Sequence, residues 1–258
     1  MSLAKLPARL REHDWTGAVI ELLIVVAGIL IALQVSNWNE ERHDRARADS
    51  YYRRLHASLV TGRKSMEDTL VFWRQVSAYG RAAMDFSETG KRVDGSNWKT
   101  VLAFYQASQL MPFELEDTTF LEMRDTGNLT LIRDEALRNR IAEYYGITSV
   151  GSIRANILRH DPEYRRQIRG LTPWPVQEYI WATCYRQLGG TRQELIDCPA
   201  PISDEAAASV LATYRHTDSL LPNLRYWVST LRVSEIVVTD ARKNVDELAR
   251  DIQAARGQ

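Results

Sequence analysis

The feature that most constrains this chain is an apolar stretch close to its N-terminus. Residues Thr16–Val35 read TGAVIELLIVVAGILIALQV and contain a single charged side chain. Because an α-helix rises about 1.5 Å per residue, about 20 apolar residues cross the roughly 30 Å hydrocarbon core of a bilayer. Trp15 and Trp38 flank the stretch, as aromatic residues do at membrane interfaces. We therefore predict a transmembrane helix over residues 15–38, anchored at its ends by these two tryptophans.

A cleaved signal peptide is the main alternative for this stretch. Such a peptide has a shorter apolar core and a small-residue cleavage site. Here the apolar run is long and continues into Asn37–Arg42 (NWNEER) without such a site. The predicted organisation is a short tail over residues 1–14, an uncleaved transmembrane helix over 15–38 and an extramembrane domain over 39–258.

The predicted span has one face that suits contact with another helix. Glu21, Gly28 and Ala32 are separated by seven and four residues, so they share one side of a helix. Gly28-x-x-x-Ala32 is a pair of small residues that permits close helix approach in a membrane. The alternative is a glutamate that extends to the headgroups beside two small residues that occur together by chance. Both interpretations stay open.

The orientation of the span is argued from charge and from cysteine content. Basic residues are more numerous after the span than before it, which alone would place the large domain in the cytoplasm, although long domains translocate largely regardless of charge. The chain's two cysteines, Cys184 and Cys198, flank a Gly-Gly and Pro-x-Pro loop. This arrangement is typical of a disulfide in an oxidising compartment; two unrelated buried thiols are the alternative. We predict a cytoplasmic N-terminus and a large domain outside the cytoplasm.

The rest of the chain reads as helices. Apolar residues recur every three or four positions after the span, which predicts that the span continues as one long helix, with a bend or stop at Gly62 or Gly80. That stripe consists of Tyr52, Leu55, Leu59, Met66, Leu70, Trp73 and Val76. A second long amphipathic helix is predicted over residues 222–255. The expected fold is all-α: one N-terminal transmembrane helix continuing into an extramembrane helical bundle with long first and last helices.

Capping residues and turn residues divide the middle of the chain. We predict a turn over 88–97, a helix from Asn97 to Leu110 and a short helix from Asp117 or Thr118 to Gly127. A longer helix is predicted from Asp134 to Ile153 and Ile157, with interruptions near Gly146 and Gly151. After it we predict a helix over 176–188, a loop over 189–201 and a helix from Ser203 to Tyr214. Only Ile236–Val238 resembles a strand.

Composition and motifs exclude several functions. Lys plus Arg and Asp plus Glu both number 33, so the chain lacks the basic excess of a nucleic-acid-binding protein. It has no zinc, phosphate-loop or nucleophile-elbow motif. Glu40-x-x-His43 is half of a di-iron motif without its second half. We predict no catalytic, cofactor-binding or metal site, and no cofactor.

Two groups of side chains remain ambiguous. An acidic cluster is either a cation or docking site or a set of helix-start carboxylates, which we favour; it consists of Glu114, Glu116, Asp117, Glu122 and Asp125. An aromatic group is either a ligand pocket or, as we favour, hydrophobic core; it consists of Trp98, Phe104, Tyr105, Phe120, Tyr144 and Tyr145.

Two blocks of the sequence are distinctive: Glu21–Gln34 (ELLIVVAGILIALQ) with Asn37–Arg42, and Gly127–Ile132 (GNLTLI) with Leu137–Ile141 and Tyr144-Tyr145. Together they resemble an uncharacterised bacterial family of single-span, membrane-anchored helical proteins, a domain of unknown function. The chain departs from the family at Ser36, where asparagine is expected, and the resemblance covers roughly the first 160 residues. It implies a bacterial inner-membrane protein with one span, and no activity.

These observations favour a non-enzymatic accessory or scaffold subunit. Its span and helical domain would pack against a larger membrane complex, of which an energy-transducing complex is one candidate. The expected partners are membrane lipids and other transmembrane helices or subunits, with a homo-oligomer as a further option and no nucleic acid. Two alternatives stay open: a periplasmic sensor or ligand-binding helical module, and an enzyme of unknown type.

Overall fold

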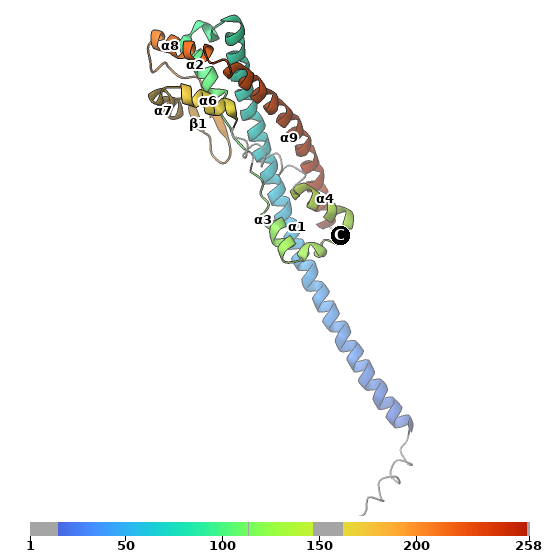
Figure 1. Ribbon diagram of the computed structural model, residues 1–258. Coiled ribbons are helices and arrows are strands. Elements are labelled where there is room, and N and C mark those ends of the chain that lie inside the picture. Colours follow the sequence, from blue (N-terminus) through green and yellow to red (C-terminus); the bar gives the residue numbers. More distant parts are fainter. Residues whose placement is uncertain (1–14, 113, 147–161, 257–258) are drawn as a thin grey trace, which may run out of the picture. The chain divides into compact units, whose positions relative to one another are not determined.

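The computed structural model describes residues 15–112, 114–146 and 162–256, with side chains from residue 19 onward (Figure 1). The chain divides into two units, Met1–Tyr51 and Tyr52–Gln258, and the long helix α1 (Trp15–Thr89) contributes to both. The described residues hold eight α-helices and one two-stranded hairpin. The predicted all-α class, with long first and last helices, is confirmed.

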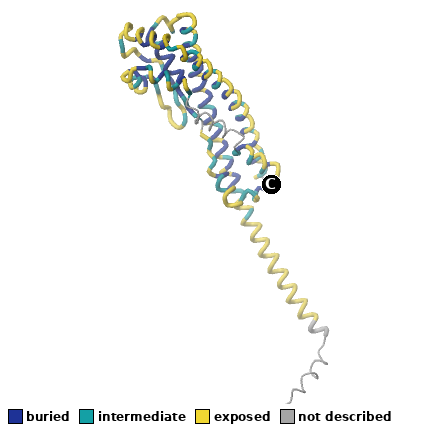
Figure 2. Tube along the Cα trace, viewed as in Figure 1, coloured by how far each residue is buried: buried dark blue, intermediate teal, exposed yellow. Residues whose placement is uncertain are grey.

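In the first unit, α1 is exposed on every side from Val19 to His43 (Figure 2). Its apolar window has a mean hydropathy of 2.5, and none of it is buried within the structure. Among the described residues, α1 is the one helix long and apolar enough to cross a membrane. The backbone stays helical through residue 38, where the predicted span ends, and the first unit ends at Tyr51.

The second unit is built on α1 and the last helix, α9 (Leu220–Arg256), which run side by side in opposite directions (Figure 1). Contacts pair the later residues of α1 with the earlier residues of α9: Arg63 with Asp246, Ser77 with Glu235 and Glu88 with Arg225. The apolar stripe predicted on α1, from Tyr52 to Val76, is buried throughout. α9 completes this core with its own apolar face: Leu224, Trp227, Leu231, Val238, Val245, Leu248 and Ile252.

The bend or stop predicted at Gly62 or Gly80 is wrong, because α1 is helical through both positions to Thr89. At Gly80 the reason is close packing against α9. A Cβ atom there would lie 2.5 Å from the Val228 Cγ2 atom, well inside van der Waals contact. The absence of a side chain therefore lets α9 approach α1 at this point, at the small helix-propensity cost that glycine carries.

Shorter elements pack at both ends of this pair: those between residues 118 and 145 lie near the C-terminal end of α9, and the others lie near its N-terminal end (Figure 1). In chain order, the shorter elements are η1 (Val93–Gly95), α2 (Asn97–Gln106), α3 (Thr118–Asp125), η2 (Asn128–Leu131), α4 (Glu135–Tyr145), α6 (Glu163–Leu171), α7 (Trp174–Thr183), β1 (Tyr185–Gln187), β2 (Gln193–Leu195) and α8 (Asp204–Arg215). The predicted continuation through Gly151, Ile153 and Ile157 lies outside the described residues.

Capping explains where several of these helices begin. Asp134 and Ser203 accept hydrogen bonds from the backbone amides of Leu137 and Ala206, which confirms both as N-caps. The cap predicted at Asn97 is wrong by one residue, because Ser96 accepts the bond from the Lys99 amide. The same helix, α2, ends at Gln106 and not at the predicted Leu110, and α3 ends at Asp125, two residues before the left-handed Gly127.

The helix predicted over 176–188 is wrong in its second half. α7 stops at Thr183, and the chain continues as an antiparallel hairpin in which Tyr185 pairs with Leu195. Gly189 and Gly190 form the turn with φ of +95° and +55°, a region that disfavours residues with a side chain. Two consecutive residues of this kind reverse the chain, so the strands pair where a helix and a loop were expected.

Candidate functional site

The predicted helix-contact face lies on the first unit. α1 is helical from residue 15, so Glu21, Gly28 and Ala32 do lie along one side of it, and all three are exposed. A Cβ atom added to Gly28 would meet nothing within 4 Å. This side of the helix is therefore open to a neighbour, and the small residues leave room for a close one.

Aromatic and charged side chains lie together at the C-terminal end of the predicted span. The Trp38 side chain is 63% exposed, and the Arg42 guanidinium lies 5.8 Å from the centre of its ring. One turn further along, Arg45 pairs with Glu41 at 2.8 Å. The side chain of Trp15, at the other end, lies outside the described residues. Aromatic residues are enriched at membrane interfaces, and Trp38 occupies that place at the end of the predicted span.

The two cysteines, Cys184 and Cys198, are joined by a disulfide with Cα atoms 5.2 Å apart. It connects the end of α7 to the loop before α8, and α2 fixes both ends. The Gln106 side-chain amide donates to the Cys184 carbonyl at 2.8 Å, and the Trp98 indole donates to the Cys198 carbonyl at 2.9 Å. The disulfide is therefore part of the buried framework of the second unit.

The aromatic group named from the sequence belongs to the core. Five of its members are buried, and the sixth, Tyr145, is half-buried and stacks on Phe120 with ring centres 4.9 Å apart. Two further tyrosines deepen this core: the Tyr164 hydroxyl donates to the Phe104 carbonyl at 2.7 Å, and Tyr214 lies 2.7 Å from the Thr172 hydroxyl. Burial raises the pKa of Tyr164 well above its ordinary value.

The acidic cluster does not come together as a metal site. No group of three or more potential metal ligands occurs in the part of the chain that the structure describes. Instead, Glu122 pairs with Arg54 of α1, Asp125 pairs with Arg124, and Asp117 occupies the N-cap position of α3 without a side-chain cap bond. The predicted helix-start position is right for Asp117 and wrong for Glu122 and Asp125, which lie in the second half of α3 and pair with arginines instead.

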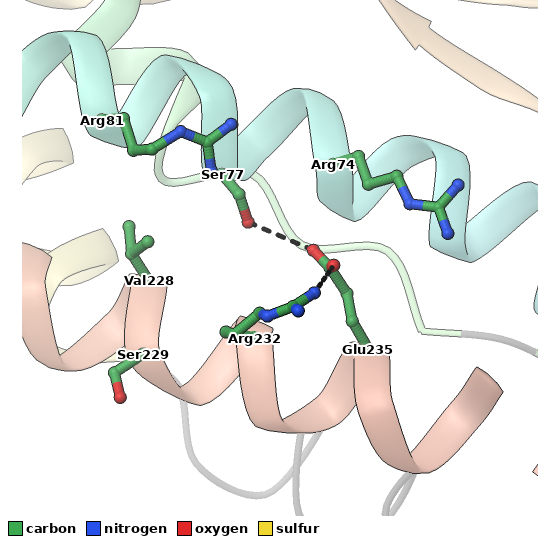
Figure 3. Close-up of a pocket in the computed structure, with 7 residues that line it drawn as sticks. All are labelled: Arg74, Ser77, Arg81, Val228, Ser229, Arg232 and Glu235. Atoms are coloured by element: carbon green, nitrogen blue, oxygen red, sulfur yellow. Dashed lines mark hydrogen bonds and ion pairs between the residues drawn. The ribbon is translucent and has the colours of Figure 1, made fainter. Parts of the chain in front are cut away.

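One pocket, which the sequence did not indicate, lies between α1 and α9 within the second unit (Figure 3). It has a volume of about 470 Å³. Its lining comes from both helices: Arg74, Ser77 and Arg81 of α1, and Val228, Ser229, Arg232 and Glu235 of α9. The one available signal was the seven-residue spacing of Arg74 and Arg81, which puts two arginines on one side of α1.

Comparison of the chain with protein-family models, curated proteins and solved structures finds no match. The resemblance to an uncharacterised bacterial family therefore stays a prediction. The class that the structure itself defines is an all-α protein with one candidate membrane-spanning helix among the residues described.

Proposed function

We propose that this protein is a non-enzymatic, single-pass membrane protein that serves as an accessory or scaffold subunit of a larger membrane complex. The observation that carries this proposal is the apolar part of α1. Its most apolar 18-residue segment has a mean hydropathy of 2.5, and no other part of the described structure covers it. Because each Å² of apolar surface left in water costs about 25 cal/mol, a segment exposed on all sides favours insertion into lipid.

The proposed location is the bacterial inner membrane, with the N-terminus in the cytoplasm and the second unit in the periplasm. Two observations support it: the resemblance of residues 21–42 to the membrane-anchored family, and the Cys184–Cys198 disulfide. Disulfides persist in oxidising compartments such as the periplasm and are rare in the cytoplasm.

The proposed contact between the span and its complex is the side of α1 that carries Glu21, Gly28 and Ala32. Lipid tails are as apolar as leucine, so helix association in a membrane depends on close packing and on polar contacts between helices. Gly28 and Ala32 permit the close packing, and Glu21, near the end of the predicted span, can supply a polar contact. The partner is a transmembrane helix of another subunit, with self-association as the alternative outcome.

Co-purification tests this assignment. We expect defined membrane subunits to accompany the tagged full chain in a fixed ratio after mild-detergent purification and mass spectrometry. Gly28→Leu with Ala32→Leu should reduce that co-purification at least tenfold, because the larger side chains separate the two helices. Both residues lie on an uninterrupted part of α1, so the span itself stays helical.

A matched control enlarges the opposite side of the same helix. Val26 and Leu30 lie two residues from Gly28, about 200° away around the axis. Val26→Phe with Leu30→Phe should leave co-purification unchanged. A protein that purifies alone, or a partner that both variant pairs release equally, would contradict the accessory-subunit proposal.

A second candidate function, a ligand-binding helical module, is supported by the pocket between α1 and α9. Its volume of about 470 Å³ falls in the range of about 300–1,000 Å³ that small-molecule sites occupy. Charged and hydroxyl side chains dominate its lining. This candidate is compatible with a role in a membrane complex, because the pocket lies wholly in the second unit.

A further inference from the structure

The pocket between α1 and α9 carries an excess of positive charge. Three arginines and one carboxylate line it, together with two hydroxyl groups and one valine. The carboxylate, on Glu235, is already engaged: it accepts a bond from the Ser77 hydroxyl at 3.4 Å and pairs with Arg232 at 3.4 Å (Figure 3). One positive charge is thereby balanced inside the pocket, and those of Arg74 and Arg81 remain.

Elsewhere between the same two helices, several arginines pair with carboxylates of the facing helix. Arg63 lies 2.6 Å from Asp246, and Arg225 lies 2.6 Å from Glu88. Within the residues that the structure describes, Arg74 and Arg81 have no such partner, although they lie between these pairs along α1. The row of ion pairs between α1 and α9 is thus interrupted where the pocket opens.

Glu235 also fixes the geometry of the pocket. Its side chain is only 9% exposed, and a buried carboxylate is stable only when it is paired and hydrogen-bonded. Ser77 and Arg232, one from each helix, serve that purpose. The Ser77 bond joins α1 to α9, the Arg232 pair lies within α9, and Arg74 and Arg81 are both exposed.

We propose that this pocket binds a small anionic ligand through a phosphate group, with Arg74 and Arg81 as the main ligand-binding residues. This inference rests on the second candidate function and names its ligand class. A phosphate group offers three or four acceptor oxygens on one atom, so it can accept bonds from guanidinium groups and a hydroxyl on two helices at once. A carboxylate offers two oxygens in one plane, which a single guanidinium can fill.

The remaining lining residues offer contacts to the part of the ligand beyond its phosphate group. Ser229 and Arg232 offer further donors on the α9 side, and Val228 offers one apolar contact. The pocket volume exceeds that of a phosphate group alone, so the ligand carries further atoms beside its phosphate. A free phosphorylated metabolite and a lipid headgroup share this chemistry.

Calorimetric titration of the full chain tests the proposal. The protein is placed in nanodiscs of zwitterionic phosphatidylcholine, and the probes are inorganic pyrophosphate, short-chain phosphatidic acid and citrate. We expect a phosphate probe to bind and its affinity to fall at least tenfold in Arg74→Gln with Arg81→Gln. Glutamine keeps a polar side chain but removes the charge that attracts the anion.

A matched control removes the same charge elsewhere. Arg133 and Arg250 are exposed and lie outside the pocket, so Arg133→Gln with Arg250→Gln should leave affinity unchanged. Circular dichroism should show equal folding of both variant pairs. Binding of pyrophosphate identifies a free phosphorylated metabolite as the source, and binding of phosphatidic acid alone identifies a lipid headgroup; either supports the proposal.

Three results would overturn the proposal: no binding of either phosphate probe, equal weakening by both variant pairs, or citrate binding as tight as that of the phosphate probes. A further experiment distinguishes failure of the phosphate assignment from failure of the ligand-binding function itself. It uses a neutral disaccharide as the probe and Ser229→Trp as a variant that blocks the pocket. If the disaccharide binds and Ser229→Trp prevents it, the module still binds a ligand, and only the phosphate assignment fails. If neither binds, both fail.

Discussion

Replacing Trp73 with alanine is expected to destabilise the second unit by about 3–5 kcal/mol, a large share of the roughly 5–15 kcal/mol that keeps a typical domain folded. The Trp73 ring is 0% exposed on the core side of α1, so its loss leaves a cavity. Its indole also donates to the Met111 carbonyl at 2.9 Å, which holds the segment after α2 against α1. Urea unfolding of the full chain in detergent, followed by circular dichroism, measures the change.

Two variants make this prediction specific. Trp73→Phe keeps an aromatic ring in the core and loses the hydrogen bond, so it should cost less, about 1–3 kcal/mol. Trp174, at the start of α7, is 66% exposed, and Trp174→Ala should change the free energy of unfolding by no more than about 0.5 kcal/mol. Equal effects of Trp73→Ala and Trp174→Ala would contradict the placement of Trp73 at the centre of the core.

Removing the Cys184–Cys198 disulfide is expected to cost roughly 3 kcal/mol. The bond closes a loop with a sequence separation of 14, and such a loop restricts the unfolded chain by about that amount. Cys184→Ala with Cys198→Ala avoids placing hydroxyls among buried neighbours. The same unfolding measurement, carried out on protein isolated under non-reducing conditions, gives the difference.

Reductant supplies the control for this prediction. Dithiothreitol should destabilise the wild-type chain by a similar amount and leave the double alanine variant unchanged. Two free thiols in protein isolated from its own membrane, with no effect of the reductant, would contradict both the disulfide and the proposed periplasmic location of the second unit.

The parts of the fold that follow from local pattern were predictable from the sequence. The hydropathy of residues 16–35 predicts a long apolar helix, and the three- to four-residue spacing from Tyr52 to Val76 predicts which side of α1 is buried. Asp134 and Ser203 mark helix starts because their short side chains accept bonds from amides three residues ahead. Each of these signals lies within a few turns of chain.

The parts that depend on distant contacts were not predictable in this way. Gly80 looks like a helix stop until Val228, about 150 residues later, is seen beside it. The hairpin after α7 depends on two left-handed glycines and on the strand that they return to. The pocket needs α1 and α9 together, because each helix supplies only part of its lining.

We expect the apolar part of α1 to stay in the protein and to anchor it in a membrane. The intact mass of the protein recovered from membranes washed at alkaline pH, which releases peripheral proteins, tests this anchoring. The expected result is a membrane-bound chain of about 29.6 kDa that retains residues 15–38. A shorter chain in the soluble fraction, cleaved after the apolar stretch, would show instead that the stretch is a signal peptide.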